Sequence, residues 1–330
     1  AYVEQRPKGG PRPDLSGGRA KRYGFKIYPT VAEALRCGGK KLDVDCVLLI
    51  GEHGNYGYNE YGQKLYPRHR LFTDITKVYK ADGKSMPVFN DKHLSYSFKK
   101  AKEMVSLSKE LKFPFLAGSS LPVTWRMPAI EMPLGAELQE AMSIAFGPKD
   151  IYDFHAIETL QCMTERRKGG ETGIAAIEAI EGEAFWKAMA AGSFEKGGWD
   201  PKLFEACLSR SQTLKQPKSY SHRYPTVAEM KKKSPKPRAF RFHYKDGCKA
   251  TTIMLNGVVS DFTFAGRIKG RDKPLSSLFY LPPNPNVVYS GALMYNAERM
   301  FMSGEAPFPV ERTMLTSGMV ESGLMSLKKG

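Results

Sequence analysis

The chain has 330 residues, which is enough for two domains or one large domain. Apolar residues make up 42% of the chain and aromatic residues 11%, so it can form hydrophobic cores and is not wholly disordered. No apolar run approaches the ~20 residues that span a bilayer, so an integral membrane protein is not expected. Lys and Arg number 50 against 34 Asp and Glu, a formal charge of +16 that bears on partners rather than on fold.

The five cysteines are odd in number and include no Cys-x-x-Cys pair. Neither a disulfide framework nor a thiolate zinc site is therefore expected. The first residues also lack the basic stretch and the apolar run of a signal peptide. These features together favour a cytoplasmic protein.

Positive charge is concentrated between Lys215 and Lys245, where ten Lys or Arg accompany a single acidic residue, Glu229. Such a cluster can bind a phosphate backbone by releasing its counterions. It can equally be a solvated, proline-punctuated loop between a helix and a strand. No signature of a nucleic-acid-binding fold accompanies it, so we interpret residues 215–238 as a basic loop and do not expect a nucleic-acid partner.

Up to about residue 120, predicted strands alternate with predicted helices. Continuous apolar runs such as VDCVLLIGE indicate strands that are buried on both faces of a parallel sheet. The strands are expected at 1–4, 25–30, 44–52, 86–90 and 113–120, and the helices at 15–24 (with Ser16 as its cap), 31–39, 71–80 and 95–112. This alternation predicts a Rossmann-like, doubly wound α/β domain over residues 1–120.

The pattern changes after Pro122. Helices are expected at 136–146, 151–167, within 183–210, at 291–304 and at 313–327, and strands at 174–182, 239–247, 249–257, 261–270 and 276–283. The closely spaced strands with Gly or Pro between them are typical of an antiparallel sheet. We therefore expect an α+β domain with a mostly antiparallel sheet over residues 121–330, without internal repeats.

Polar side chains follow three of the predicted parallel strands. They are Glu52, His53 and Asn55, beside Gly51, after the first strand, Asn90, Asp91, Lys92 and His93 after the second, and Ser119, Ser120, Trp125 and Arg126 after the third. Ligands of an open parallel sheet bind beyond the carboxyl ends of its strands. One polar strand end is an ordinary loop, but three at one sheet edge predict a shared binding site.

Two residue sets could move a proton. His155 and Glu158 are three residues apart on a predicted helix, so the carboxylate can orient the imidazole as an acid or base. Lys92, if desolvated, can exchange a proton near neutral pH. A metal could be ligated by a set of five residues, His53, Asp91, His93, His155 and Glu158. No two of these histidines show the short spacing of a zinc helix, so no metal site is predicted.

The order of these segments resembles the glucose–fructose oxidoreductase, inositol dehydrogenase and rhizopine-catabolism (Gfo/Idh/MocA) family. That family places Glu-Lys-Pro where this chain has Asp91-Lys92-His93, and it carries a His followed three residues later by an acid, as His155 and Glu158 are. The family also has an Asp four residues before that His. This chain has Ile151 at that position, with Asp150 and Asp153 nearby. The resemblance continues through the C-terminal run from NAERMFMSG to SGLMSL and covers nearly the whole chain.

One departure concerns the cofactor. The family begins with a strand and a glycine-rich turn that holds the dinucleotide pyrophosphate at a helix N-terminus. This chain contains no GxGxxG, so the turn either lies outside these 330 residues or is lacking in a divergent member. Glu4 stands where an acid could meet a ribose hydroxyl, whereas Arg6 could favour a 2′-phosphate, which leaves NAD and NADP both open.

The resemblance implies an NAD(P)-dependent oxidoreductase acting on a sugar, cyclitol or related polyol. Lys92 or His155 would move the hydroxyl proton, Glu158 would orient His155, and His93, Trp125 and Arg126 would contact the substrate. An exposed antiparallel sheet would support a homo-oligomer. The alternatives are a non-catalytic relative that binds a sugar or a partner, a metal-assisted lyase or hydrolase, and a nucleic-acid binder.

Overall fold

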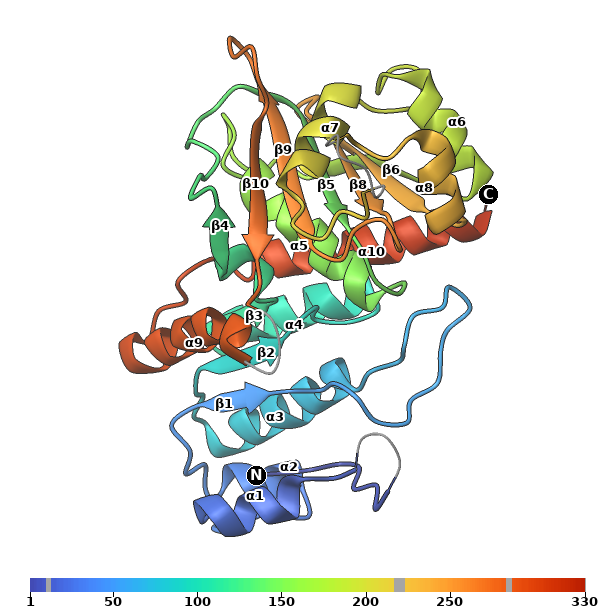
Figure 1. Cartoon of the computed structure of the whole chain (residues 1–330). Helices are drawn as coiled ribbons and strands as arrows, with labels where there is room; N and C mark the ends of the chain where they lie inside the picture. Colours follow the sequence, from blue (N-terminus) through green and yellow to red (C-terminus); the bar gives the residue numbers. More distant parts are fainter. Residues whose placement is uncertain (10–12, 217–222, 283–286, 330) are drawn as a thin grey trace. The chain divides into compact units, whose positions relative to one another are not determined.

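The structure is a computed structural model that describes residues 1–9, 13–216, 223–282 and 287–329 (Figure 1). The chain forms two compact units, and each is described by itself. Unit 1 comprises Ala1–Asn59, Lys64–Gly118 and Tyr295–Met314, and unit 2 comprises Glu60–Gln63, Ser119–Met294 and Leu315–Gly330. Along the described residues, no helix is both long and apolar enough to cross a membrane.

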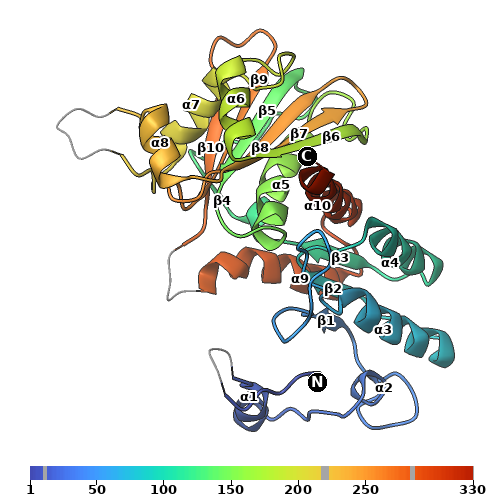
Figure 2. The same ribbon diagram turned by 90° about the vertical axis from the view of Figure 1, so that its right-hand side faces the viewer.

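Unit 1 is built on a parallel three-stranded sheet in the order β1-β2-β3. Its strands are β1 (Val47–Leu49), β2 (Val88–Asp91) and β3 (Phe115–Gly118), and its helices are α1 (Ser16–Tyr23), α2 (Val31–Leu35), α3 (Arg68–Asp82), α4 (Phe98–Glu110) and most of α9 (Gly291–Ser303). Figure 2 shows α3 and α4 on one face of the sheet and α9 on the other. The α/β alternation predicted for this region is confirmed, because each apolar strand needs helices to cover it.

The prediction that residues 44–52 are a strand buried on both faces is wrong. β1 has only three residues, and it is an edge strand of the sheet in the part of the chain described here. Leu48, which pairs with the fully buried Phe89 of β2, is itself 53% exposed. An apolar run therefore indicated a strand correctly but could not show how many neighbours that strand has.

The two strands predicted nearest the N-terminus are also wrong. Residues 1–4 and 25–30 contribute only an isolated parallel bridge between Tyr2 and Tyr28. The helix expected after them does form, but Ser16 is its first residue and not its cap. Asp14 accepts the backbone N–H and the hydroxyl of Ser16, both at 2.9 Å.

Unit 2 contains a seven-stranded sheet in the order β4-β10-β9-β5-β8-β7-β6. The strands are β4 (Trp125–Met127), β5 (Leu138–Ala145), β6 (Ile174–Glu181), β7 (Arg238–Tyr244), β8 (Lys249–Met254), β9 (Phe262–Ile268) and β10 (Leu275–Tyr280). Its helices are α5 (Ile151–Thr164), α6 (Glu183–Ala191), α7 (Pro201–Arg210), α8 (Val227–Lys233) and most of α10 (Glu311–Lys329), with short 3₁₀ turns at Leu121–Val123 and Val287–Ser290. Its strand pairs are antiparallel except β5–β8.

Helices pack on both faces of this sheet. Figure 2 shows α5 and α10 on one face and α6, α7 and α8 on the other. Apolar side chains of these helices form a separate core with each face. The central strands β5, β8 and β9 are consequently buried along most of their length. The open sheet face from which a homo-oligomer was expected is therefore not present on these strands, and the oligomeric state remains a prediction without that support.

Residues 136–146 form strand β5 rather than the predicted helix. The segment LQEAMSIA is rich in helix-forming residues, which is why its local propensity favoured a helix. In the structure it pairs with β8 on one side and β9 on the other, and all but one of its residues are buried. Tertiary packing of a central strand has overridden the local preference.

The basic segment 215–238 is more than a connecting loop. It contains α8, whose N-terminus is closed by reciprocal hydrogen bonds between Thr226 and Glu229. Met230 of this helix is buried in the core between the sheet and helices α6 and α7. The remaining part of the predicted loop includes residues 217–222, which lie outside the described residues.

Candidate functional site

The carboxyl ends of β1 and β2 bring three charged side chains of unit 1 together. The Lys92 ammonium forms an ion pair with the Glu52 carboxylate, and the side chains are only 19% and 7% exposed. Asp91 is the last residue of β2, and its carboxyl group lies near enough to Lys92 and Glu52 for their charges to act on it. The predicted convergence of the first two strand ends is thus present within unit 1.

The direction of the Lys92 side chain is set by its backbone conformation and by one backbone hydrogen bond. Lys92 has a φ of 58°, in the left-handed region that non-glycine residues rarely occupy. Its N–H donates to the carbonyl of Gly118 at the end of β3, at 3.0 Å. This bond continues the sheet pairing past β2 and fixes where the lysine side chain leaves the sheet.

Burial and neighbouring charges act in opposite directions on the two carboxyl groups. Burial raises the pKa of Asp91 to about 6, although the Lys92 ammonium opposes that shift. Burial also acts to raise the pKa of Glu52, but the charge and hydrogen bond of Lys92 prevail and hold it below its usual range. The site therefore contains one carboxylate that stays ionised and a second carboxyl group that titrates close to neutral pH.

Arg68 was not among the predicted site residues. It lies at the start of α3, is almost fully buried, and stacks over the ring of Tyr66 at 4.6 Å. Its Nη1 lies 3.5 Å from Nε2 of the buried His93, and its charge acts on both Glu52 and Asp91. A Cβ on Gly51 would lie 2.9 Å from Cγ of Arg68, so glycine at position 51 allows the arginine to approach the strand end.

The side chain of Asn90 carries a hydrogen-bond acceptor that the described residues leave unsatisfied. Asn90 is fully buried on β2, and its Oδ1 has no hydrogen-bond partner among the described residues. A buried polar atom without a partner costs free energy unless something outside the chain satisfies it. Its oxygen can accept an N–H or O–H from a bound ligand.

The N-terminal segment contacts the loop that follows β1. Glu4 accepts the Tyr56 hydroxyl at 2.7 Å and forms an ion pair with Arg70. The Gln5 side chain accepts the Asn55 N–H at 2.7 Å and donates to the carbonyl of the same residue at 3.3 Å. The carboxylate predicted to bind a ribose is thus already engaged by its own chain, and the other predicted residues of this region, Arg6 and His53, are exposed.

In unit 2, His155 and Glu158 lie on α5 as predicted. The His155 ring packs edge-on against Tyr152 at 5.7 Å and Phe262 at 6.3 Å. Glu158 is almost fully buried and accepts the Ser119 N–H at 3.1 Å and the Thr316 hydroxyl at 3.0 Å. Its carboxylate therefore links Ser119 to α10 through hydrogen bonds. The spacing of His155 and Glu158 did not indicate this structural role.

The first turn of α5 is anchored by buried charges. Asp153 accepts the Asp150 N–H at 2.8 Å, and two nitrogens of Arg238 donate to its other oxygen at 2.8 and 2.5 Å. Both side chains of this ion pair are buried. The acids beside Ile151 that the family comparison drew attention to are thus used to start the helix that carries His155.

Trp125 and Arg126 lie on the short edge strand β4. Trp125 is half exposed, which leaves its ring available to a ligand. The Arg126 guanidinium donates to the carbonyls of Thr124 at 2.5 Å and Pro122 at 2.9 Å and stacks on Phe279 at 3.7 Å. It is therefore occupied within its own unit.

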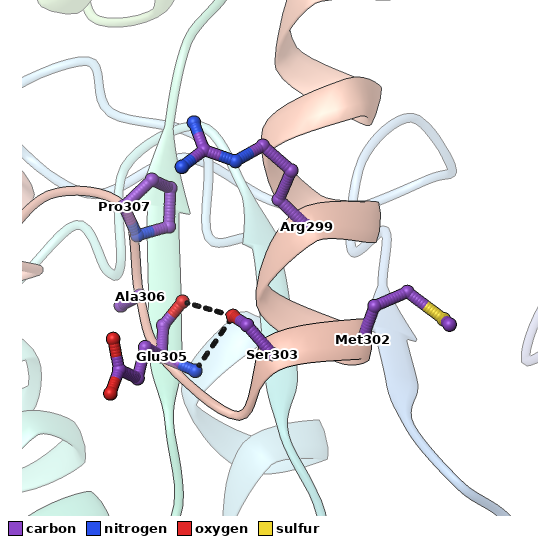
Figure 3. Close-up of a pocket in the computed structure, with 6 residues that line it drawn as sticks. All are labelled: Arg299, Met302, Ser303, Glu305, Ala306 and Pro307. Atoms are coloured by element: carbon purple, nitrogen blue, oxygen red, sulfur yellow. Dashed lines mark hydrogen bonds between the residues drawn. The ribbon is translucent and has the colours of Figure 1, made fainter.

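No group of three or more His, Cys, Asp or Glu side chains among the described residues is placed to hold a metal ion. The structure has a cavity of about 560 Å³ at the end of α9 and one of about 340 Å³ in unit 2. Figure 3 shows the first, which is lined by Arg299, Met302, Ser303, Glu305, Ala306 and Pro307. Neither lining includes a predicted site residue.

No family model and no curated protein matches the sequence. Solved structures do match over nearly the whole chain. GenD2 from gentamicin A biosynthesis, in complex with NAD, has a TM-score of 0.57 at 11% identity and covers 96% of this chain and 84% of its own. A Gfo/Idh/MocA family oxidoreductase from Vibrio cholerae has a TM-score of 0.50 at 11% identity, with coverages of 94% and 86%.

The chain has the Gfo/Idh/MocA fold. A myo-inositol dehydrogenase from Corynebacterium glutamicum matches in the same way, with a TM-score of 0.51 at 11% identity and coverages of 94% and 85%. The resemblance predicted from the sequence is confirmed at the level of the fold. This chain's small parallel sheet and larger, mostly antiparallel sheet match that fold. Similarity at such identity carries no residue role, and fold alone does not decide function.

Proposed function

We propose that the protein is an oxidoreductase that uses NAD or NADP and acts on a sugar, cyclitol or related polyol. The observation that carries this proposal is the cluster of Lys92, Glu52 and Asp91 at the carboxyl ends of two parallel strands. Ligands of such sheets bind at this edge, and interconversion of an alcohol and a carbonyl needs a group that moves a proton there. The similar structures named above include one in complex with NAD and a myo-inositol dehydrogenase.

The residues present fit one end of a dinucleotide. The unpartnered Asn90 oxygen can accept the carboxamide N–H of a nicotinamide, whose ring gives or takes a hydride when bound. The sequence holds no GxGxxG turn for the pyrophosphate, and Glu4 is engaged by Tyr56 and Arg70. We therefore assign Asn90 to the nicotinamide end of the cofactor and assign no residue to the pyrophosphate or the adenosine ribose.

Within unit 1, Lys92 would hold or move the proton at the substrate oxygen. Unit 2, taken by itself, carries His155 as a proton-transfer group, and the half-exposed ring of Trp125 offers an apolar surface for the C–H groups of a sugar ring.

The first experiment is a fluorescence titration of the purified chain with NADH and with NADPH, followed by a screen of polyols and their keto forms. We expect saturable binding of one nucleotide. Lys92→Ala and His155→Ala should each abolish turnover and leave nucleotide binding and the circular dichroism spectrum unchanged. Lys77→Ala, which removes an exposed lysine from α3 in the same unit, is the matched control and should retain full activity. Turnover at the wild-type rate in Lys92→Ala would exclude the proposed role.

A second candidate is a non-catalytic relative that binds a sugar or a partner protein. The contacts of Glu4 favour it, because a carboxylate engaged by Tyr56 and Arg70 is not free to accept a ribose hydroxyl of a dinucleotide. Absence of nucleotide binding together with saturable binding of a polyol, measured by calorimetry, would support this candidate over the enzyme.

A further inference from the structure

Helix α9 presents large exposed side chains on the side opposite to its buried residues. Its residues 295–303 belong to unit 1, where Ala297 and Met300 are fully buried. Tyr295 and Met302 are 61% and 85% exposed. Because they are seven residues apart, they lie on one face of the helix. Large aromatic and thioether side chains gathered on one exposed face are typical of a contact surface.

Two opposite charges lie between these side chains. Glu298 and Arg299 follow Tyr295 by three and four residues and are both exposed, so they share its helix face. The Arg299 guanidinium stacks on the Tyr295 ring at 5.9 Å. We call this set the α9 stripe: Tyr295, Glu298, Arg299 and Met302. Along the helix its order is apolar, negative, positive, apolar, so the same stripe in the reverse direction offers a positive charge to each negative one. A surface that complements itself in this way suits a second copy of the chain related by a two-fold axis.

We propose that the protein forms a homodimer in which the α9 helices of two copies pack antiparallel, with the two-fold axis between Glu298 and Arg299. In this register Glu298 of each copy faces Arg299 of the other, and Tyr295 of each faces Met302 of the other. A parallel arrangement would place like charges against each other at both positions, which is unfavourable. The two ion pairs therefore set the direction and the register, and the apolar side chains contribute most of the binding free energy.

The cavity at the end of α9 provides a place for the aromatic side chain of the other copy. It has a volume of about 560 Å³ and is lined by Arg299, Met302 and Ser303 of the helix and by residues 305–307 of the segment that follows (Figure 3). Antiparallel packing brings Tyr295 of one copy beside Met302 of the other, and therefore to the rim of this cavity. An aromatic side chain that enters a hollow of its partner is a common anchor of an interface, and contact with a thioether adds to it.

This surface differs from the one on which an oligomer was first expected. Helices cover both faces of the seven-stranded sheet, whereas the α9 stripe is exposed. Four side chains and a cavity rim are a small contact beside the about 800 Å² per partner of a standard interface. We therefore expect a weak dimer with a dissociation constant in the micromolar range. The inference goes beyond the proposed function and does not depend on it.

Sedimentation velocity from low micromolar to several hundred micromolar protein tests the proposal. The wild-type chain should change from monomer to dimer as its concentration rises. Glu298→Arg and Arg299→Glu should each stay monomeric, because each variant places like charges at both contacts. An equimolar mixture of the two variants should dimerise, since each contact then joins opposite charges again. The double variant, which exchanges the two charges within one chain, should dimerise for the same reason.

Two further variants separate the α9 stripe from other surfaces. Tyr295→Ala should raise the dissociation constant about tenfold or more, because it removes the anchor. Glu110→Arg, which reverses an exposed charge at the end of α4, is the matched control and should dimerise as the wild type does. The substituted side chains are exposed, so circular dichroism spectra should be unchanged.

Three results would contradict the proposal. A wild-type chain that is monomeric at the highest concentration would exclude the dimer, and this result needs no variant to fold. Dimers of undiminished strength in both charge-reversal variants would place the interface elsewhere. A mixture of the two variants that remains monomeric would exclude the antiparallel pairing of Glu298 with Arg299.

Discussion

Replacing Arg238 tests how unit 2 holds the helix that carries His155. Arg238 and Asp153 form a buried ion pair, and the Arg238 guanidinium also donates to the carbonyl of Gly147 at 3.0 Å. Arg238→Met keeps an apolar stem of similar length but leaves the Asp153 carboxylate without its counter-charge. Breaking a buried pair in this way costs about 3–5 kcal/mol, and for a unit of this size that lowers the melting temperature by roughly 6–20 °C.

The loss should depend on pH in a defined direction. Burial already raises the pKa of Asp153, and Arg238 opposes that shift, so removing the arginine raises the pKa further. A carboxyl group with a raised pKa in the folded state binds a proton more tightly when folded. It therefore destabilises the fold fully above that pKa, and the effect declines as the pH falls towards the pKa of the unfolded state. The difference in unfolding free energy between wild type and Arg238→Met should therefore shrink as the pH falls from 8 towards about 4.

Urea unfolding followed by circular dichroism across this pH range provides the assay. Adding Asp153→Asn to Arg238→Met removes the uncompensated charge and should recover part of the lost stability at neutral pH. Arg241→Met on the same strand is the control, since its partner Glu178 is half exposed and can be solvated, so its effect should carry no such pH dependence. A loss below about 1 kcal/mol, or one that does not change with pH, would refute this account of α5.

Two further predictions concern packing. Met230→Ala, on helix α8, should lower the free energy of unfolding by about 2–5 kcal/mol, because Met230 is buried in the core between the sheet and the helices. A melting curve within error of the wild type would show that α8 does not stabilise this core. Gly323→Ala, within α10, should lower the free energy of unfolding by about 1–3 kcal/mol, because the new Cβ would lie 2.5 Å from Cδ1 of Phe240 on β7. If that contact is the cause, adding Phe240→Leu should reduce the loss.

Several elements were predictable because their information is local. Helix α4 has apolar residues at helical spacing, and β2 and β3 are short apolar runs followed by polar or small residues. The proximity of Glu52 to Asp91 and Lys92 followed from one rule, since parallel strands present their carboxyl ends at the same edge. That prediction required no knowledge of which residues far apart in the sequence contact each other.

Other features depend on partners that lie far away in the sequence. Arg68 approaches the strand ends because Gly51 leaves room for it, and Glu158 binds Ser119 and Thr316, which are 39 and 158 residues away. Segment 138–145 is a strand only because β8 and β9 pair with it on either side. None of these contacts leaves a periodic signal in the segment itself.

The sequence by itself determined the class of fold, the order of most elements and the edge of the parallel sheet where Lys92 would lie, because hydrophobic periodicity and strand direction are properties of short segments. The tertiary structure decided that β1 is an exposed edge strand, that both faces of the larger sheet are covered, and that the charge of Lys92 is balanced by Glu52 and Asp91. Burial and electrostatics depend on which side chains surround a group in space, and only the folded chain brings those side chains together.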